Sequence, residues 1–215
     1  MPALRQAPVV SGHTKERLIH MKYLSSIFFC FIHIIVAGQT IEYRNDSLYI
    51  NTLFVDAKTS NVKIDSLVGS KRISKSSKDD YKTNPTTGKS VIQETDFYFE
   101  KGLFFRRYDF DKNAFTVGIR LLGGENQKAK TQTGLDKSFE GELLIEGNHM
   151  NEIKKASQLT KLKNCEVIYR SLRTSSREYL MQAEIYHGNN QITIFLDEDT
   201  NEVTSIFISL NLTDK

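Results

Sequence analysis

The chain has 215 residues, with 29 Lys and Arg, 26 Asp and Glu, and a formal net charge of +3. Four of the cations and one of the acids precede residue 39, so the remainder carries 25 residues of each sign. Proteins that bind nucleic acids draw much of their affinity from cations that neutralise phosphates. The neutral remainder argues against such a role, and we expect no nucleic-acid partner.

An apolar segment near the N-terminus has the layout of a secretory signal peptide. Lys22 precedes a run of mainly Ile, Phe and Val over Ile27–Ala37, and the small residue Gly38 follows. Such signals combine a cation, an apolar stretch of about 7–15 residues and a small-residue cleavage site, whereas a membrane span needs about 20 residues. We predict a signal peptide over 21–38 and export to the periplasm or cell surface. An uncleaved N-terminal anchor is the alternative, and would be the only membrane contact.

Residues 1–20 do not resemble part of this signal, because Met21-Lys22-Tyr23 is a more natural start. We interpret 1–20 as an upstream extension. The alternative is a long polar leader on the same signal.

Cysteine usage excludes a disulfide framework. Cys30 lies inside the apolar run and follows Phe28 and Phe29, where a lipoprotein signal needs small residues. Cleavage would leave Cys165 alone, so we expect the fold to depend on an apolar core. We interpret Cys165 as a small buried hydrophobe.

The first half of the remainder predicts a hairpin, a helix and a strand meander. Glu42–Asp56 is typical of a hairpin, and the helix that follows has Ser60 as its N-cap and Gly69 as its stop. The polar stretch Ser74–Ser90 predicts a solvated loop, with a binding loop as the alternative. Strands then follow within residues 96–122.

The second half predicts a similar order of elements. Residues 123–138 are rich in Gly, Gln, Lys and Thr and indicate a linker or surface loop. Gly141–Ile153 predicts a hairpin that turns at Gly147-Asn148, and a short helix follows, with Ser157 as a possible cap. Strands are expected at Val167–Tyr169, within 184–196 and at Val203–Leu210.

The two halves match one another without a gap at an offset of 88, when residues 96–120 are set against 184–208. Apolar class and turn chemistry agree along this stretch. We therefore predict two related hairpin-helix-meander units, at 39–122 and 139–215, in an α+β fold that is mainly antiparallel β-sheet with short helices.

The helix that ends in Leu67-Val68-Gly69 and the meanders Phe97–Leu122 and Ile185–Leu210, with their Asp/Asn turns, carry a resemblance. The layout resembles tandem β-sheet and helix proteins of the bacterial envelope, of the β-lactamase inhibitor protein and small outer-membrane assembly lipoprotein types, and uncharacterised exported domains of that pattern. The resemblance implies a protein that binds other proteins and performs no chemistry.

Two Asp-x-Asp-x-Asn segments resemble the opening of a calcium loop. In the segments at 109–113 and 197–201, the sixth position is Ala114 or Glu202 instead of Gly. The bidentate Glu at the twelfth position is replaced by Arg120 or Ile208. We therefore predict hairpin turns and no metal.

Nucleophilic catalysis finds little support in the sequence. His149 and His187 are the only histidines after residue 38, and neither has a second histidine at ligand spacing. Cys165 with either histidine is a conceivable nucleophile and base, but its place before a strand favours a structural role. We expect no catalytic residues and no cofactor.

Arg106 occupies the alternation position that Ile194 fills in the second half, between Phe104 and Tyr108. A charge that points into a core is costly unless it is paired. Arg106 could pair with a buried carboxylate, its strand could face a groove, or a bulge could shift the register. Arg106 and Tyr108 are also typical of protein-binding surfaces, so we take both as possible partner contacts.

The sequence therefore favours an exported, non-catalytic protein that binds another protein in the cell envelope. One variant is a periplasmic inhibitor or immunity protein against a toxin or hydrolase. The alternatives are a hydrolase with its site between the two units and a purely structural domain.

Overall fold

The computed structural model describes residues 38–83, 87–109, 111–122, 130, 132–173 and 179–211, without the side chains of 79–83, 172–173 and 179–180. The predicted upstream extension and signal peptide, except Gly38, lie outside these residues. The chain divides between Gly38 and Gln39, and residues 39–215 form one compact unit.

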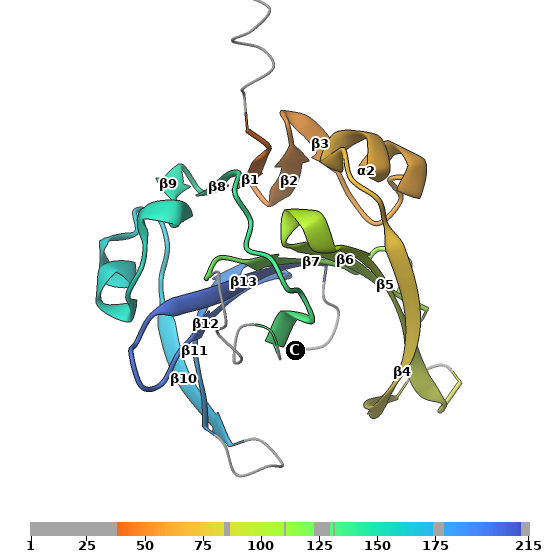
Figure 1. The fold of residues 1–215 in the computed structure, drawn as a ribbon. Helices are drawn as coiled ribbons and strands as arrows, with labels where there is room; N and C mark the ends of the chain where they lie inside the picture. Colours follow the sequence, from red (N-terminus) through yellow and green to blue (C-terminus); the bar gives the residue numbers. More distant parts are fainter. Residues whose placement is uncertain are drawn as a thin grey trace, which may run out of the picture. The chain divides into compact units, whose positions relative to one another are not determined.

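A five-stranded sheet, sheet A, is built from the two predicted hairpins. Its order is β3-β2-β1-β8-β9, and β1 and β8 are parallel neighbours (Figure 1). The strands are β1 (Thr40–Arg44), β2 (Ser47–Ile50), β3 (Leu53–Val55), β8 (Glu142–Ile145) and β9 (Asn148–His149). The turns between β1 and β2 and between β8 and β9 use left-handed backbone at Asn45, Asp46, Glu146 and Gly147.

The helix α2 (Asn61–Val68) begins and ends where the sequence predicts. The Ser60 side chain accepts a hydrogen bond from the Lys63 backbone N–H, and Gly69 closes the last turn with φ of 64°. Ile64 and Val68 are buried, so one face of α2 packs on the core.

An eight-stranded antiparallel sheet, sheet B, forms the other layer. Its order is β10-β11-β12-β13-β7-β6-β5-β4. Its strands are β4 (Ile73–Thr83), β5 (Ser90–Tyr98), β6 (Leu103–Tyr108), β7 (Phe115–Arg120), β10 (Ile168–Arg173), β11 (Tyr179–His187), β12 (Asn190–Leu196) and β13 (Val203–Leu210). In Figure 1 the outer strands β4 and β10 bend away from sheet A.

From each edge of sheet B to its centre, the strands follow one another in sequence order. Four consecutive strands of the first half run inward to β7, four of the second half run inward to β13, and these two pair antiparallel at the centre. Three 3₁₀ helices connect the strands: η1 (Phe99–Lys101), η2 (Met150–Glu152) and η3 (Ala156–Lys161).

One face of sheet B and sheet A share a continuous apolar core. Alternation within each strand sends every second side chain to this face. The core side chains of sheet B include Leu103, Phe105, Val117, Ile119, Ile192, Ile194, Ile206 and Ile208, and those of sheet A include Ile41, Tyr43, Leu48, Leu143 and Ile145. The predicted fold class, α+β and mainly antiparallel sheet, is confirmed.

Two predicted segments differ in the structure. Ser74–Thr83 is not a loop, because β4 covers Ile73–Thr83 and pairs with β5 from Ile73↔Phe97 onward. Its Ser and Lys residues are typical of a loop, but β4 is an edge strand. Charged side chains are common on edge strands because they hinder pairing with another chain. The short second helix is the 3₁₀ helix η3, whose N-cap is Lys155 and not Ser157.

The described part of the predicted linker is not wholly a surface loop. Leu135 is fully buried and Thr133 nearly so. The buried Arg120 donates to the backbone oxygens of Leu122, at 2.8 Å, and Leu135, so it fastens this segment to the end of β7. The polar composition of residues 123–138 gave no sign of the buried Leu135 or of its hydrogen bond to Arg120.

The offset of 88 between the halves is wrong by one residue for β6 and β7. Phe105 pairs with Val117 and Ile194 pairs with Ile206, and all four lie in the core. The residue numbers of these two pairs differ by 89, whereas an offset of 88 would set Phe105 against Thr193, which lies on the other face of β12. A shift of one residue exchanges the faces of a strand.

None of the helices in the described part of the chain has the length and apolar character that crossing a membrane requires.

Candidate binding groove

Arg106 lies on the face of sheet B that points away from the core. Its neighbours Phe105 and Arg107 point to the core side, and its cross-strand partners are Thr95 and Thr116. The Arg106 Nε donates to Thr95 Oγ1 at 3.2 Å, and its guanidinium carbon lies 5.0 Å from the centre of the Phe104 ring. The idea that Arg106 fills the same position as Ile194 is therefore wrong, and the Arg106 charge does not enter the core.

Tyr108 lies on the same face as Arg106, beside the polar side chains of the central strands. Its hydroxyl is 3.2 Å from Thr116 Oγ1, which lies 3.1 Å from Ser209 Oγ. This chain of hydroxyls joins β6, β7 and β13 across the centre of sheet B. Arg106 and Tyr108 are both half-buried and engaged with neighbouring strands.

A row of aromatic rings crosses this face next to the hydroxyls. Phe97 stacks on Phe99 at 5.3 Å, and Phe104 and Phe195 each meet Phe207 edge to face, at 5.1 and 4.8 Å. These contacts add about 0.5–1.5 kcal/mol per pair beyond area burial. The row therefore stabilises the sheet across the centre where the two halves meet.

Glu184 forms a second polar cluster on this face. Its Oε2 accepts from Arg170 Nε at 2.5 Å and Tyr186 Oη at 2.6 Å, and its Oε1 accepts from Gln182 Nε2 at 2.5 Å. The buried carboxylate thus binds three donors from β10 and β11. Because both carboxylate oxygens of Glu184 accept hydrogen bonds, we assign this side chain a structural role that joins β10 to β11.

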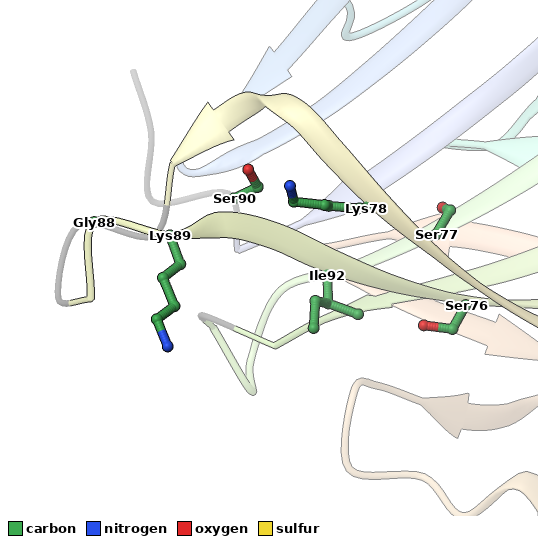
Figure 2. Close-up of a pocket in the computed structure, with 7 residues that line it drawn as sticks. All are labelled: Ser76, Ser77, Lys78, Gly88, Lys89, Ser90 and Ile92. Carbon is green, nitrogen blue, oxygen red and sulfur yellow. The ribbon is translucent and has the colours of Figure 1, made fainter.

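Three hollows share lining residues, from the β4–β5 hairpin past β5 to the loop that precedes α2. The first, of about 560 Å³, lies in the β4–β5 hairpin (Figure 2). The second, of about 420 Å³, shares Ile92 with the first and reaches Ala57 and Lys58. The third, of about 360 Å³, shares Ala57, Lys58 and Asp111 with the second and ends at Phe54. Because each hollow shares lining residues with the next, we describe them together as the β5 groove.

The β5 groove exposes large apolar side chains at two points. Ile92 is 45% exposed where the first two hollows meet, and Phe54 is 49% exposed at the far end. Both belong to a small set of large apolar side chains that remain exposed among the described residues. Tyr108 also lines the second hollow, although its hydroxyl lies on the opposite face of the sheet.

Charges are separated along the groove. Among the described residues, the charged side chains that line the first hollow are Lys78 and Lys89. The acids of the other two hollows are Asp56, Glu94, Asp109 and Asp111, and the bases are Lys58, Arg107 and Lys112. Arg107 is bound to Asp96 at 3.1 Å, so its charge is already balanced.

Hydrogen bonds between side chains and the backbone hold the segments that line the groove. Arg107 donates to the Ala57 oxygen at 3.3 Å and the Thr59 oxygen at 3.0 Å, which holds the loop before α2 against β6. The Ile92 N–H donates to Asp109 Oδ1 at 3.0 Å, and the Asp109 N–H donates to the Ile92 oxygen at 3.0 Å. The exposed Ile92 side chain is thus presented from a constrained strand.

The Asp-rich segments are turns, as the sequence predicts. Asp111 Oδ1 accepts from the Asn113 N–H at 2.8 Å, and Asp197 Oδ1 accepts from the N–H groups of Asp199 and Thr200 at 3.0 Å. Within the described ranges no three His, Cys, Asp or Glu side chains gather in a way that could hold a metal ion.

The residues considered for nucleophilic catalysis occupy different surroundings. Cys165 is half-buried, and burial raises the pKa of its thiol, which disfavours the reactive thiolate. His149 lies 3.1 Å from Glu142, and the His187 ring packs 5.7 Å from Tyr43. No contact that joins Cys165 to either histidine is found among these interactions.

Comparison with protein-family models, curated protein sequences and solved structures finds no match. The resemblance to envelope proteins therefore stays a hypothesis from the sequence pattern.

Proposed function

We propose that this chain is an exported, non-catalytic protein that binds another protein in the cell envelope. The apolar segment before residue 39 supports export. The β5 groove supports binding, and it is the observation on which the proposal rests.

Three properties of the groove favour a macromolecular partner. It is long, because three hollows share residues, and it presents separated apolar side chains on a polar floor. Small-molecule sites are usually single, enclosed and predominantly apolar. Protein-binding surfaces instead combine a few apolar anchors with polar surroundings.

Arg106 and Tyr108 remain proposed partner contacts, but the groove is the stronger candidate. The Arg106 guanidinium is engaged with Thr95 and Phe104, so its removal should cost stability before it costs binding. An inhibitor or immunity role is a special case of the same proposal, in which the bound protein is a toxin or hydrolase.

The test is affinity capture from periplasmic extract with three purified proteins: wild type, Ile92→Asp and Val62→Asp. Val62 is 77% exposed on α2 and does not line the groove, so it is the matched control. A captured protein should be identified, purified and titrated against all three by calorimetry. We expect Ile92→Asp to weaken binding by at least about tenfold, the effect of losing a buried apolar anchor. Equal affinities for wild type and Ile92→Asp would refute the groove.

We also propose that the halves 39–122 and 139–215 are copies of one ancestral unit. The mirrored strand order of sheet B and the common offset of 89 in β6–β7 and β12–β13 support this. Corresponding strands β7 and β13 meet at the centre, as they would in a symmetric dimer whose subunits became fused.

A further inference from the structure

We propose that Gln39 becomes the N-terminal residue of the exported protein and closes there into a pyroglutamate ring. The proposal rests on the export proposed above, because the modification needs the free amine that removal of the signal peptide would create. It adds a modification site at the start of sheet A.

The bond between Gly38 and Gln39 is a boundary in both sequence and structure. The predicted signal peptide ends at Gly38, which is exposed. The chain also divides at this bond, since residues 39–215 form one compact unit. Cleavage after Gly38 would therefore leave this unit whole, with Gln39 as its first residue and the α-amine of Gln39 free.

The side-chain amide of Gln39 is buried but makes no hydrogen bond. Neither its Oε1 nor its Nε2 has a partner among the described residues, although both atoms are shielded from solvent. Burial of an amide without partners costs free energy, so such groups are uncommon in folded proteins. A reaction that removes the amide nitrogen would remove part of this cost.

An N-terminal glutamine carries both groups that such a reaction needs. The neutral α-amine attacks the side-chain carbonyl carbon Cδ, and a new C–N bond forms. The bond between Cδ and Nε2 then breaks, and this nitrogen leaves as ammonia with one proton from the α-amine. The product is a neutral lactam ring. No group is oxidised or reduced, and no cofactor is consumed.

The hydrogen bonds that hold this end of the chain do not involve the reacting atoms. The Gln39 backbone oxygen accepts from the Glu142 N–H at 2.8 Å, and the Thr40 N–H donates to Asn51 Oδ1 at 3.0 Å. The ring would contain only the nitrogen, Cα and side-chain carbons of Gln39. Both hydrogen bonds are therefore compatible with ring closure, and β1 can keep its place in sheet A.

Ring closure also removes a charge from the start of β1. An α-ammonium group with an ordinary pKa of about 8 is mostly charged at neutral pH. Gln39 is only partly exposed, and a charge that lacks full hydration or a partner is unfavourable. The lactam has neither this charge nor the unpaired Nε2, so we expect the closed form to be more stable than the open form.

The first experiment expresses the full chain in a Gram-negative host together with a periplasmic glutaminyl cyclase. Protein purified from the periplasm is analysed by intact mass and Edman degradation. We expect a chain of residues 39–215 that is lighter than its sequence mass by one ammonia molecule. Edman degradation should release no residue until pyroglutamyl aminopeptidase has removed the ring, and should then read Thr40-Ile41-Glu42.

Gln39→Asn is the matched control, because it keeps an amide whose side chain is one methylene too short for this ring. It should show the full sequence mass and a readable first residue.

The second experiment measures the effect of ring closure on stability. A cleavable fusion partner in place of residues 1–38 releases residues 39–215 with a free amine, and purified glutaminyl cyclase then closes the ring in one portion. We expect the closed portion to unfold at a Tm higher by about 2–4 °C. Cyclase treatment of Gln39→Asn should leave its Tm unchanged.

A periplasmic protein that begins at another residue or keeps a free Gln39 amine would overturn the inference, as would an equal Tm of the open and closed forms. A chain that never reaches the periplasm would overturn the proposed export as well. Partner binding is measured separately, by capture with Ile92→Asp. If the chain is exported, begins at Gln39 and stays open, the proposed function stands and only the modification falls.

Discussion

The Tyr98 hydroxyl lies 2.6 Å from Asp65 Oδ1 and donates to it, which ties β5 to α2 across the edge of the core. Burial is the main cause that raises the pKa of Tyr98, and the hydrogen bond to Asp65 adds to it. The same helix residue lies 3.5 Å from Arg72, so one carboxylate joins the helix to two segments of the chain.

This contact predicts alkaline sensitivity. An acid whose pKa is raised by folding holds its proton more tightly in the folded state, so its stabilisation is lost as pH rises above its unfolded pKa of about 10. The free energy of unfolding should therefore fall from about pH 10 upward. Tyr98→Phe should cost about 1–3 kcal/mol at neutral pH and show a shallower alkaline decline. Urea unfolding at several pH values measures both, and an equally steep decline in Tyr98→Phe would contradict the assignment.

Gly118 lies at the centre of sheet B, where the Phe104 ring occupies the space of a side chain. A Cβ at Gly118 would lie 1.9 Å from Phe104 Cε1. We expect Gly118→Ala to destabilise the protein by about 1–3 kcal/mol, the usual cost of overpacking. Adding Phe104→Leu should recover part of the loss because it frees that space. Thermal unfolding of the single and double variants tests the pair, and absence of recovery would show that another contact is responsible.

Arg120 is a buried cation that binds backbone oxygens of the segment joining the halves. Removal of its side chain would leave the Leu122 and Leu135 oxygens without these donors. Arg120→Met should therefore lower the free energy of unfolding by roughly 3 kcal/mol. It should also speed tryptic cleavage after the exposed Lys137. Arg44→Met, at a half-exposed arginine of β1, is the control and should cost less than about 1 kcal/mol.

The offset between the halves can be tested by exchange. Replacing Leu103, Phe104 and Phe105 by Ile, Thr and Ile copies residues 192–194 at an offset of 89 and keeps apolar side chains on the core face. Replacing them by Gln, Ile and Thr copies residues 191–193 at an offset of 88 and buries two polar side chains. We expect the first variant to retain a cooperative unfolding transition and the second to lose it. Circular dichroism during heating distinguishes them.

Local signals predicted the elements that depend on local chemistry. The cap at Ser60 and the stop at Gly69 placed α2 to the residue. Alternation of apolar and polar residues located β12, and the β-branched and aromatic residues of 203–210 located β13. These features depend on hydrogen bonds and periodicity within one segment. The predicted fold class followed from them.

Features that depend on distant partners were not predicted. Ser74–Thr83 is a strand because β5 supplies its hydrogen bonds, although its own side chains are typical of a loop. An offset of 88 matches apolar residues of one half with apolar residues of the other. It does not match the side chains that point to the same face of the sheet, and only the register of strand pairing reveals that face. Tyr108 was named from the sequence and lines the groove, and Lys89 lies in the polar stretch considered as a binding loop. Ile92 was not named, because exposure of an apolar side chain cannot be read from its own strand pattern.

The parallel pairing of β1 with β8 has a consequence for the order of assembly. Strand β1 finds its second neighbour about one hundred residues later, so sheet A stays incomplete until β8 has been synthesised. A chain that emerges N-terminus first must hold the β1–β2 edge unsatisfied during that interval, when it is open to wrong pairing. We therefore expect slowed elongation or a bound chaperone over this window to decide yield more strongly than the stability of the finished protein does.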